Sequence, residues 1–224
     1  MTTRHSFDSG LESMNLDLMK MGALVEEQLQ QTIAALNHYN IESAEKIIGN
    51  DKLVDDFERV IERKCLGLIA LQQPLARDLR TVSTALKLIT DLERIGDHCA
   101  DISELVIRMT NDKSLKPMSM LFDMFNRAIR MVVMSIDSYM RQDVAMATDV
   151  SEMDDIVDDY FDRIKKQIVL NLKSESQEVE LAINTIFVAK YVERIADHAT
   201  NISEWAIFMV TGEHINDETG SHDA

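Results

Sequence analysis

The sequence predicts an all-α protein of six long helices, arranged as two tandem pseudo-symmetric three-helix bundles. Only 7 Gly and 2 Pro interrupt the 224 residues, which leaves few of the turn positions that a many-stranded β fold needs. Apolar residues make up 46% of the chain but aromatic residues only 5%, a composition typical of aliphatic packing between helices. An internal repeat divides the six helices into two sets of three.

The repeat is clearest in two stretches that lie one hundred residues apart. Residues 91–104 read DLERIGDHCADISE and residues 191–204 read YVERIADHATNISE, with eight of fourteen positions identical. A second pair, DKLVDDFER at 51–59 and DDIVDDYFDR at 154–163, matches at an offset of 103. Because order, spacing and residue type all repeat, we interpret the chain as a tandem duplication.

Each copy is predicted to form three helices joined by short connections, which make consecutive helices antiparallel. Pro74 separates the second helix from the third, because proline suits a first helical turn and not an interior. The expected helices cover residues 9–39, 42–72 and 75–110 in the first copy, and 118–141, 143–172 and 177–211 in the second. The bundles therefore occupy residues 1–112 and 113–212, and the polar tail at 213–224 is expected to be disordered.

The charge of the chain excludes several classes of partner. Its 39 acidic and 23 basic residues give a net charge of −16, which disfavours nucleic acid and anionic membrane surfaces. No apolar run is long enough to span a membrane and the N-terminus lacks an apolar signal core, so we expect a cytoplasmic protein without direct membrane insertion. Cys65 and Cys99 lie in apolar helical patterns without metal-ligand spacing and are expected to be reduced and buried.

Carboxylates interrupt the apolar stripes of four helices. At ~100° per residue, Glu93 and Asp97 continue the apolar stripe of their helix, where the helix is expected to face inward. That stripe consists of Leu75, Leu79, Val82, Leu86 and Ile89, and its counterpart in the second copy of Val179, Ala182, Ile186 and Ala189. The acidic positions are Asp51, Asp55, Glu93 and Asp97 in the first copy, and Asp154, Asp158, Glu193 and Asp197 in the second.

Carboxylates in an apolar seam are costly unless they are paired, protonated or bound to a cation. Two of them at i and i+4 on each of two neighbouring helices would present oxygen ligands to a common point, which suits iron, manganese, magnesium or calcium, and less often zinc. Phe161 and Lys165 replace Glu58 and Glu62 in the second copy, so the first site is the more acidic. The competing interpretation is a network in which arginines neutralise the same acids. Its members would be Arg59, Arg94, Arg163 and Arg194.

Two histidines stand next to the acidic positions. His98 and His198 point about 100° away from the neighbouring aspartates on a helical wheel. We therefore expect them to be hydrogen-bonded packing residues and not metal ligands.

The stretch QQPLARDLRTVSTALKLITDLERIGDHCADISE at 72–104, together with YVERIADHATNISE at 191–204, closely resembles the PhoU family of accessory and regulatory proteins of bacterial phosphate uptake. The resemblance implies metal binding at the eight acidic positions, with iron as the first expectation and zinc, manganese or magnesium as alternatives. It also implies a homodimer without catalytic activity.

The same resemblance implies a negative regulator of phosphate uptake and of Pho regulon signalling. Such a protein would be an adaptor between the ATPase subunit of the phosphate ABC transporter and a sensor histidine kinase. Two alternatives are a ferritin-like carboxylate-bridged metal enzyme and a purely structural helical scaffold. The enzyme is disfavoured because such sites use Glu-x-x-His, and no His in this chain has a Glu three residues before it. No Gly-rich phosphate loop or nucleophile-base arrangement appears either.

Overall fold

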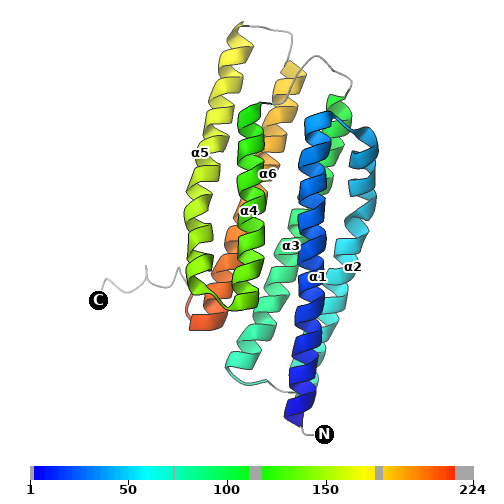
Figure 1. The fold of residues 1–224 in the computed structure, drawn as a ribbon, viewed down its shortest axis with the longest axis vertical. Coiled ribbons are helices and arrows are strands. Elements are labelled where there is room, and N and C mark those ends of the chain that lie inside the picture. Colours follow the sequence, from blue (N-terminus) through cyan, green and yellow to red (C-terminus); the bar gives the residue numbers. More distant parts are fainter. Residues whose placement is uncertain (1–2, 73, 111–117, 175–178, 215–224) are drawn as a thin grey trace, which may run out of the picture.

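The computed structural model describes residues 3–72, 74–110, 118–174 and 179–214, and these residues form six helices (Figure 1). The helices are α1 Thr3–His38, α2 Ile41–Gln72, α3 Arg77–Met109, α4 Ser119–Arg141, α5 Val144–Ser174 and α6 Val179–Thr211. The predicted all-α class and helix order are confirmed. Helix α1 begins six residues before the expected start at Ser9, and α3 begins at Arg77 instead of Leu75. Residues 111–117, between the third and fourth predicted helices, and the predicted tail from residue 215 onward lie outside the described residues.

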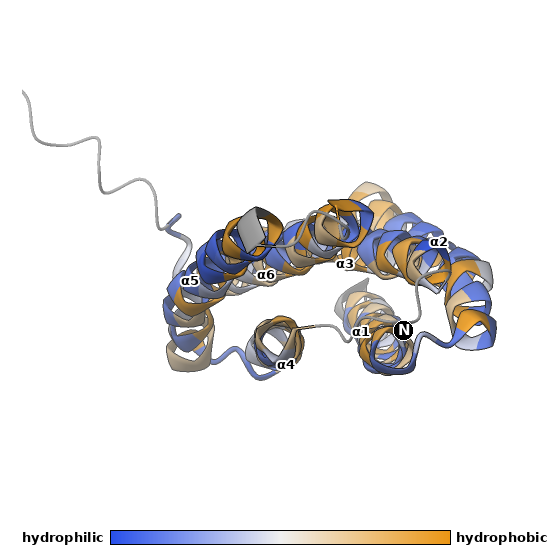
Figure 2. Ribbon diagram, turned by 90° about the horizontal axis from the view of Figure 1, so that it is seen from above, coloured by the Kyte–Doolittle hydropathy of each residue, from blue (hydrophilic) through white to orange (hydrophobic). Residues whose placement is uncertain are grey.

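The helices form two three-helix groups that lie side by side. Helices α1, α2 and α3 pack against one another, as do α4, α5 and α6, and the groups meet through α3 with α6 and α1 with α4. Seen end-on, α5, α6, α3 and α2 form one curved layer, with α4 and α1 on its concave side (Figure 2). Helices α3 and α6 run in opposite directions (Figure 1). None of the described helices is long and apolar enough to cross a membrane.

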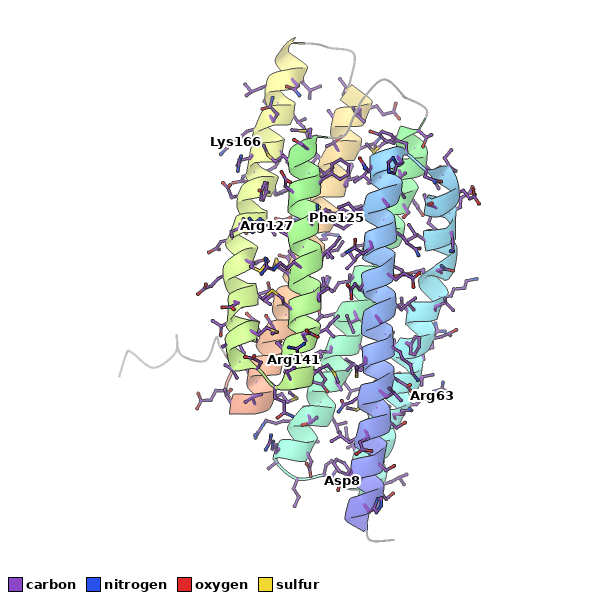
Figure 3. All side chains as sticks on the ribbon, viewed as in Figure 1. Asp8, Arg63, Phe125, Arg127, Arg141 and Lys166 are labelled. Carbon is purple, nitrogen blue, oxygen red and sulfur yellow. The ribbon has the colours of Figure 1, made fainter. Side chains whose placement is uncertain are left out.

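The repeat is visible in the core. Leu88, Leu92, Ile95, Cys99 and Ile102 of α3 are all fully buried, and so are the residues one hundred positions later. Those counterparts on α6 are Val188, Val192, Ile195, Ala199 and Ile202. Side chains fill the space between the helices, and Phe125 of α4 is among the largest that are fully buried (Figure 3). The core is mainly aliphatic, as the composition predicts.

The cysteine prediction is confirmed as far as the structure tests it. Cys65 and Cys99 are both free and buried. Burial raises the pKa of each thiol to about 12. Neither cysteine is therefore ionised near neutral pH, and both serve as small packing residues.

The turns between the first two helices of each copy have the same backbone conformation and the same capping hydrogen bond. Tyr39 and Gln142 adopt positive φ angles of 49° and 56° where α1 and α4 end. The following residues, Asn40 and Asp143, then accept hydrogen bonds from the backbone N–H groups three residues on, at 3.0 Å in both copies. These side chains satisfy free donors in the first turn of α2 and α5, which sets where each helix begins.

The apolar stripes of α3 and α6 were predicted to face inward, and this prediction is wrong at their ends. Leu75, Leu79 and Val179 are 80%, 42% and 50% exposed. Leu75 precedes α3, and Leu79 lies in its first turn at the end of the molecule. Helix α4 has 23 residues against 31 in α5 and 33 in α6, so the end of α5 and the start of α6, including Val179, extend past it (Figure 1).

Gly22 allows α1 and α4 to approach closely. A Cβ atom at position 22 would lie 3.2 Å from Cδ1 and Cγ2 of Ile136, whereas one at the exposed Gly49 would meet nothing within 4 Å. We expect Gly49→Ala to raise the free energy of unfolding by about 0.5–1 kcal/mol through helix propensity. In Gly22→Ala, crowding should cancel that gain. Urea unfolding measures both variants, and an equal gain in both would contradict the close approach.

Candidate metal centre

The eight predicted acidic positions lie in two seams. We call Asp51, Asp55, Glu93 and Asp97, between α2 and α3, the first acidic seam. Asp154, Asp158, Glu193 and Asp197, between α5 and α6, form the second acidic seam. The neighbours Val54 and Leu92 are fully buried, but the side chains of Asp55, Glu93 and Asp97 are 32%, 20% and 34% exposed. The first seam therefore lies at the edge of the core and not inside it.

Electrostatic repulsion shows that the first seam is brought together. The pKa of Asp51 is raised to about 6, first by burial and then by the charges of Asp97, Asp55 and Asp101. Asp97 and Asp101 belong to α3, so this repulsion crosses from one helix to the other. Burial is also the largest cause of the raised pKa values of Glu93 and Asp97, and Asp55 contributes to both.

The second seam repeats this arrangement. Burial, then the charges of Asp197 and Asp158, raise the pKa of Asp154 to about 6. Burial and then Glu193 raise the pKa of both Asp158 and Asp197. Oδ1 of Asp154 is buried and meets no hydrogen-bond partner of normal geometry in the described part of the chain, although the neighbouring Thr200 hydroxyl lowers the pKa of this carboxyl. A buried carboxylate oxygen of this kind is unfavourable unless a cation or proton satisfies it.

Arginines neutralise the negative charge of the first acidic seam only in part. The Arg94 guanidinium lies 3.3 Å from Asp97 and 3.5 Å from Glu93, and Arg59 lies 3.6 Å from Asp55. Both guanidinium side chains are more than half exposed and pair within their own helix, which makes such contacts weak. In the second copy, Arg163 pairs with Asp159, outside the seam, at 3.3 Å.

The acids are near one another but do not form a finished coordination sphere. Among residues 3–72, 74–110, 118–174 and 179–214, no three His, Cys, Asp or Glu side chains form a group that could hold a metal ion. The donor set is made of hard oxygens, and with the unsatisfied Asp154 oxygen it fits a hard cation better than zinc.

His98 and His198 lie where α3 packs against α6, and both have hydrogen-bond partners, as expected of packing residues. His98 Nδ1 lies 3.3 Å from Asp101 Oδ2, and His198 Nδ1 lies 2.8 Å from Asp91 Oδ1 on the other helix. Asn201 also donates to Asp91, and the two imidazole rings are 5.6 Å apart. Burial is the main cause of the lowered pKa of His98. Sequence reasoning missed this junction. Its signal was that Asp91 corresponds to Tyr191, one of the six positions at which the two repeated stretches differ.

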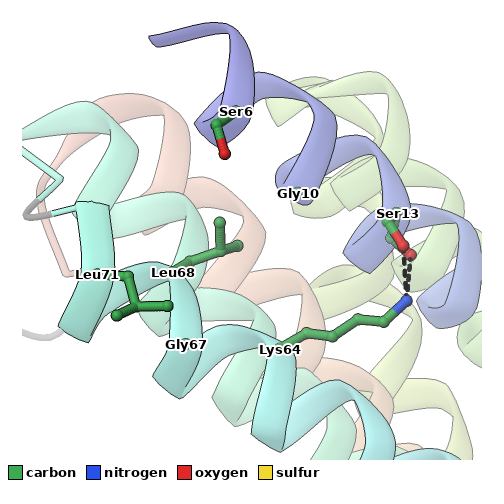
Figure 4. Close-up of a pocket in the computed structure, with 7 residues that line it drawn as sticks. All are labelled: Ser6, Gly10, Ser13, Lys64, Gly67, Leu68 and Leu71. Carbon is green, nitrogen blue, oxygen red and sulfur yellow. Dashed lines mark hydrogen bonds between the residues drawn. The ribbon is translucent and has the colours of Figure 1, made fainter. Parts of the chain in front are cut away.

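A small pocket lies away from both seams, between α1 and α2 (Figure 4). It has a volume of about 240 Å³, and its lining includes Ser13, Lys64, Leu68 and Leu71. The Lys64 ammonium donates to the hydroxyl of Ser13 and to Asp17 Oδ2, both at 2.6 Å. Lys64 is also the main cause of the lowered pKa of Asp17. Because this ammonium is already paired, the pocket offers no open site for an anion.

The fold and the two seams define a duplicated six-helix protein with a carboxylate cluster in each half. The chain belongs to the PhoU family. The family model of the PhoU domain matches it twice, at residues 18–106 and 121–206. A protein of Clostridium acetobutylicum named phosphate-specific transport system accessory protein PhoU homolog is 35% identical over 215 residues, covering 96% of this chain and 98% of the relative. A homologue of the same name from Aquifex aeolicus is 36% identical over 203 residues, covering 91% and 92% of the two chains.

Solved structures agree with this assignment. PhoU from Pseudomonas aeruginosa superposes with a TM-score of 0.89 at 29% identity, covering 92% of this chain and all of its own. The phosphate transport system regulatory protein PhoU from Streptococcus pneumoniae gives a TM-score of 0.88 at 27% identity, with coverage of 94% and 99%. The Streptococcus pneumoniae protein is named as regulatory and the Clostridium acetobutylicum relative as accessory, and the family model matches once within helices α1 to α3 and once within helices α4 to α6.

Proposed function

We propose that this protein is a negative regulator of phosphate uptake and of Pho regulon signalling. It would act in the cytoplasm as an adaptor between the ATPase subunit of a phosphate ABC transporter and a sensor histidine kinase. The observation that supports this role is near full-length similarity to proteins named as accessory to phosphate-specific transport, with 96% of this chain and 98% of the first relative covered. We also expect a homodimer.

An adaptor needs a surface that binds its partners, and α6 offers one. Val179, Ile183 and Phe187 recur every four residues along α6 and are 50%, 47% and 51% exposed. Val169 and Leu170, near the end of α5, are 51% and 60% exposed. Clustered exposed apolar side chains often mark protein-binding sites. We assign this α5–α6 surface to the transporter ATPase subunit.

Pull-down of the purified ATPase subunit and of the kinase's cytoplasmic part, at high and low phosphate, tests the adaptor. Phe187→Glu is expected to reduce capture of the ATPase subunit by about tenfold or more, because a charge would replace an apolar anchor. Leu16→Glu, at a 53% exposed position on α1, is the matched control and should bind normally. Failure to capture either partner at both phosphate levels would refute the adaptor role. Equal losses in both variants would refute only the surface.

We further propose that hard metal ions, iron first, bind both acidic seams. A bound cation would supply positive charge between carboxylates that otherwise repel one another across α2 and α3, and across α5 and α6. The raised pKa values of Asp51 and Asp154 support this proposal. Elemental analysis of protein purified without a chelating tag tests it, and a preparation free of metal after incubation with Fe²⁺ or Mn²⁺ would contradict it.

A further inference from the structure

The two acidic seams differ at one end. Beside the first seam, Glu58 of α2 lies close enough to Glu62 and Asp55 for their charges to raise its pKa, after burial, while Thr90 of α3 lowers it. The repeat places Phe161, Lys165 and Lys190 at the positions of Glu58, Glu62 and Thr90. Counting these positions, the first seam has six carboxylates, whereas the second has four carboxylates and two ammonium groups.

In the structure, the two lysines lie next to the Phe161 ring, and Lys190 also contacts an acid of the second seam. The Lys190 ammonium forms an ion pair with Glu193, whose side chain is only 15% exposed. The same ammonium lies 5.4 Å from the centre of the Phe161 ring, and that of Lys165 lies 4.4 Å from it. An aromatic ring with two ammonium groups nearby holds positive charge at this end of the seam.

Lys190 also acts on the other carboxylates of the seam. Its charge lowers the pKa of Asp158 and of Asp197, against the larger opposing effect of burial on both. A metal ion entering between these acids would be repelled by the ammonium and would have to compete with it for Glu193. Arg94 pairs with Glu93 and Asp97 in the first seam, but the repeat keeps an arginine, Arg194, at the equivalent position of the second copy. Lys190, which stands where the first copy has Thr90, is therefore a cation that the second seam has in addition.

We propose that Lys190 is a built-in cation of the second acidic seam, so that the seams bind hard divalent cations unequally and the first fills before the second. This inference rests on the proposed metal binding and adds a residue that sets the order of filling.

Calorimetric titration of the metal-free full-length protein with Mn²⁺ tests the proposal. The wild type should show a tighter and a weaker class of sites, and Glu93→Ala with Asp97→Ala should remove the tighter one. In that background, Lys190→Thr should tighten the remaining class by about tenfold, because it removes a positive charge beside the metal ligands. Thr90→Lys in the otherwise wild-type chain should weaken the tighter class by a similar factor.

Lys166→Thr is the matched control, because it removes the same charge from an exposed position on α5 (Figure 3). An equal effect of Lys166→Thr would show a net-charge effect and overturn the proposal. Two equal classes of sites in the wild type, with no response to Lys190→Thr, would overturn it while leaving metal binding intact. A wild-type protein that binds no Mn²⁺ would overturn metal binding as well. Thermal unfolding of each variant confirms that it is folded.

Discussion

Replacing Glu93 and Asp97 together by alanine is expected to abolish metal binding at the first acidic seam while leaving the helix content unchanged. The two side chains supply the α3 half of the ligand set, and Asp51 and Asp55 alone cannot surround a hard cation that takes six or more oxygen ligands. Both residues lie at the edge of the core, so alanine leaves the buried face of α3 intact. Elemental analysis and circular dichroism measure the two outcomes.

A control variant must remove the same charge without touching a seam. Glu26→Ala with Glu27→Ala does so on the exposed face of α1 and should retain all the metal. Undiminished metal in the Glu93 and Asp97 variant would show that the cation binds elsewhere. Equal losses in both double variants would show that net charge, and not coordination, retains the metal.

The metal-free protein is expected to be more stable at pH 5 than at pH 7.5. Asp51 and Asp154 have folded-state pKa values of about 6, above the usual 3.8, so the folded state binds more protons than the unfolded state between pH 4 and 6. The free energy of unfolding therefore falls as pH rises through this window. Over the whole pH range each carboxyl accounts for at most about 3 kcal/mol, but only about half of this falls between pH 5 and pH 7.5. With solvent screening of these half-buried groups, each contributes at most about 1 kcal/mol to the measured difference.

Urea unfolding in the presence of a chelator, at pH 5 and pH 7.5, measures this dependence. Asp51→Asn with Asp154→Asn should raise stability at pH 7.5 and flatten the pH dependence, whereas Asp56→Asn, at a 70% exposed side chain, should change little. The lowered pKa of the buried His98 acts in the opposite direction below its usual value, and the comparison with the asparagine variants removes that contribution. An unchanged slope in the double variant would contradict the raised pKa values.

Helix order and the proximity of the acids could be predicted from sequence because both follow from local rules. The periodicity that buries Leu92 and Ile95 also fixes Val192 and Ile195, and the duplication places Asp51 near Asp97 in the same way as Asp154 near Asp197. A helical wheel gives the direction of a side chain but not what covers it.

The structure differs from the prediction where the exposure or contact of a side chain depends on how a neighbouring helix is placed. The exposure of Val179 depends on the length of α4, which periodicity on α6 does not encode. The half-buried state of Glu93 depends on where α2 lies beside α3. The contact of His198 with Asp91 joins the two halves and depends on the packing of α3 against α6. Lys190 was missed because its role appears only when its ammonium is seen beside Glu193 and Phe161.

The junction between α3 and α6 also bears on how the two halves could diverge. In a symmetric dimer of identical subunits, every contact across the axis occurs twice, and any substitution changes both copies at once. Here the halves share one chain, so Asp91 can bond His198 while Tyr191 packs its ring against His98, at 5.4 Å between ring centres. Because the two halves are joined in one chain, a substitution in one half does not change the other. Lys190 could therefore arise beside the second acidic seam alone.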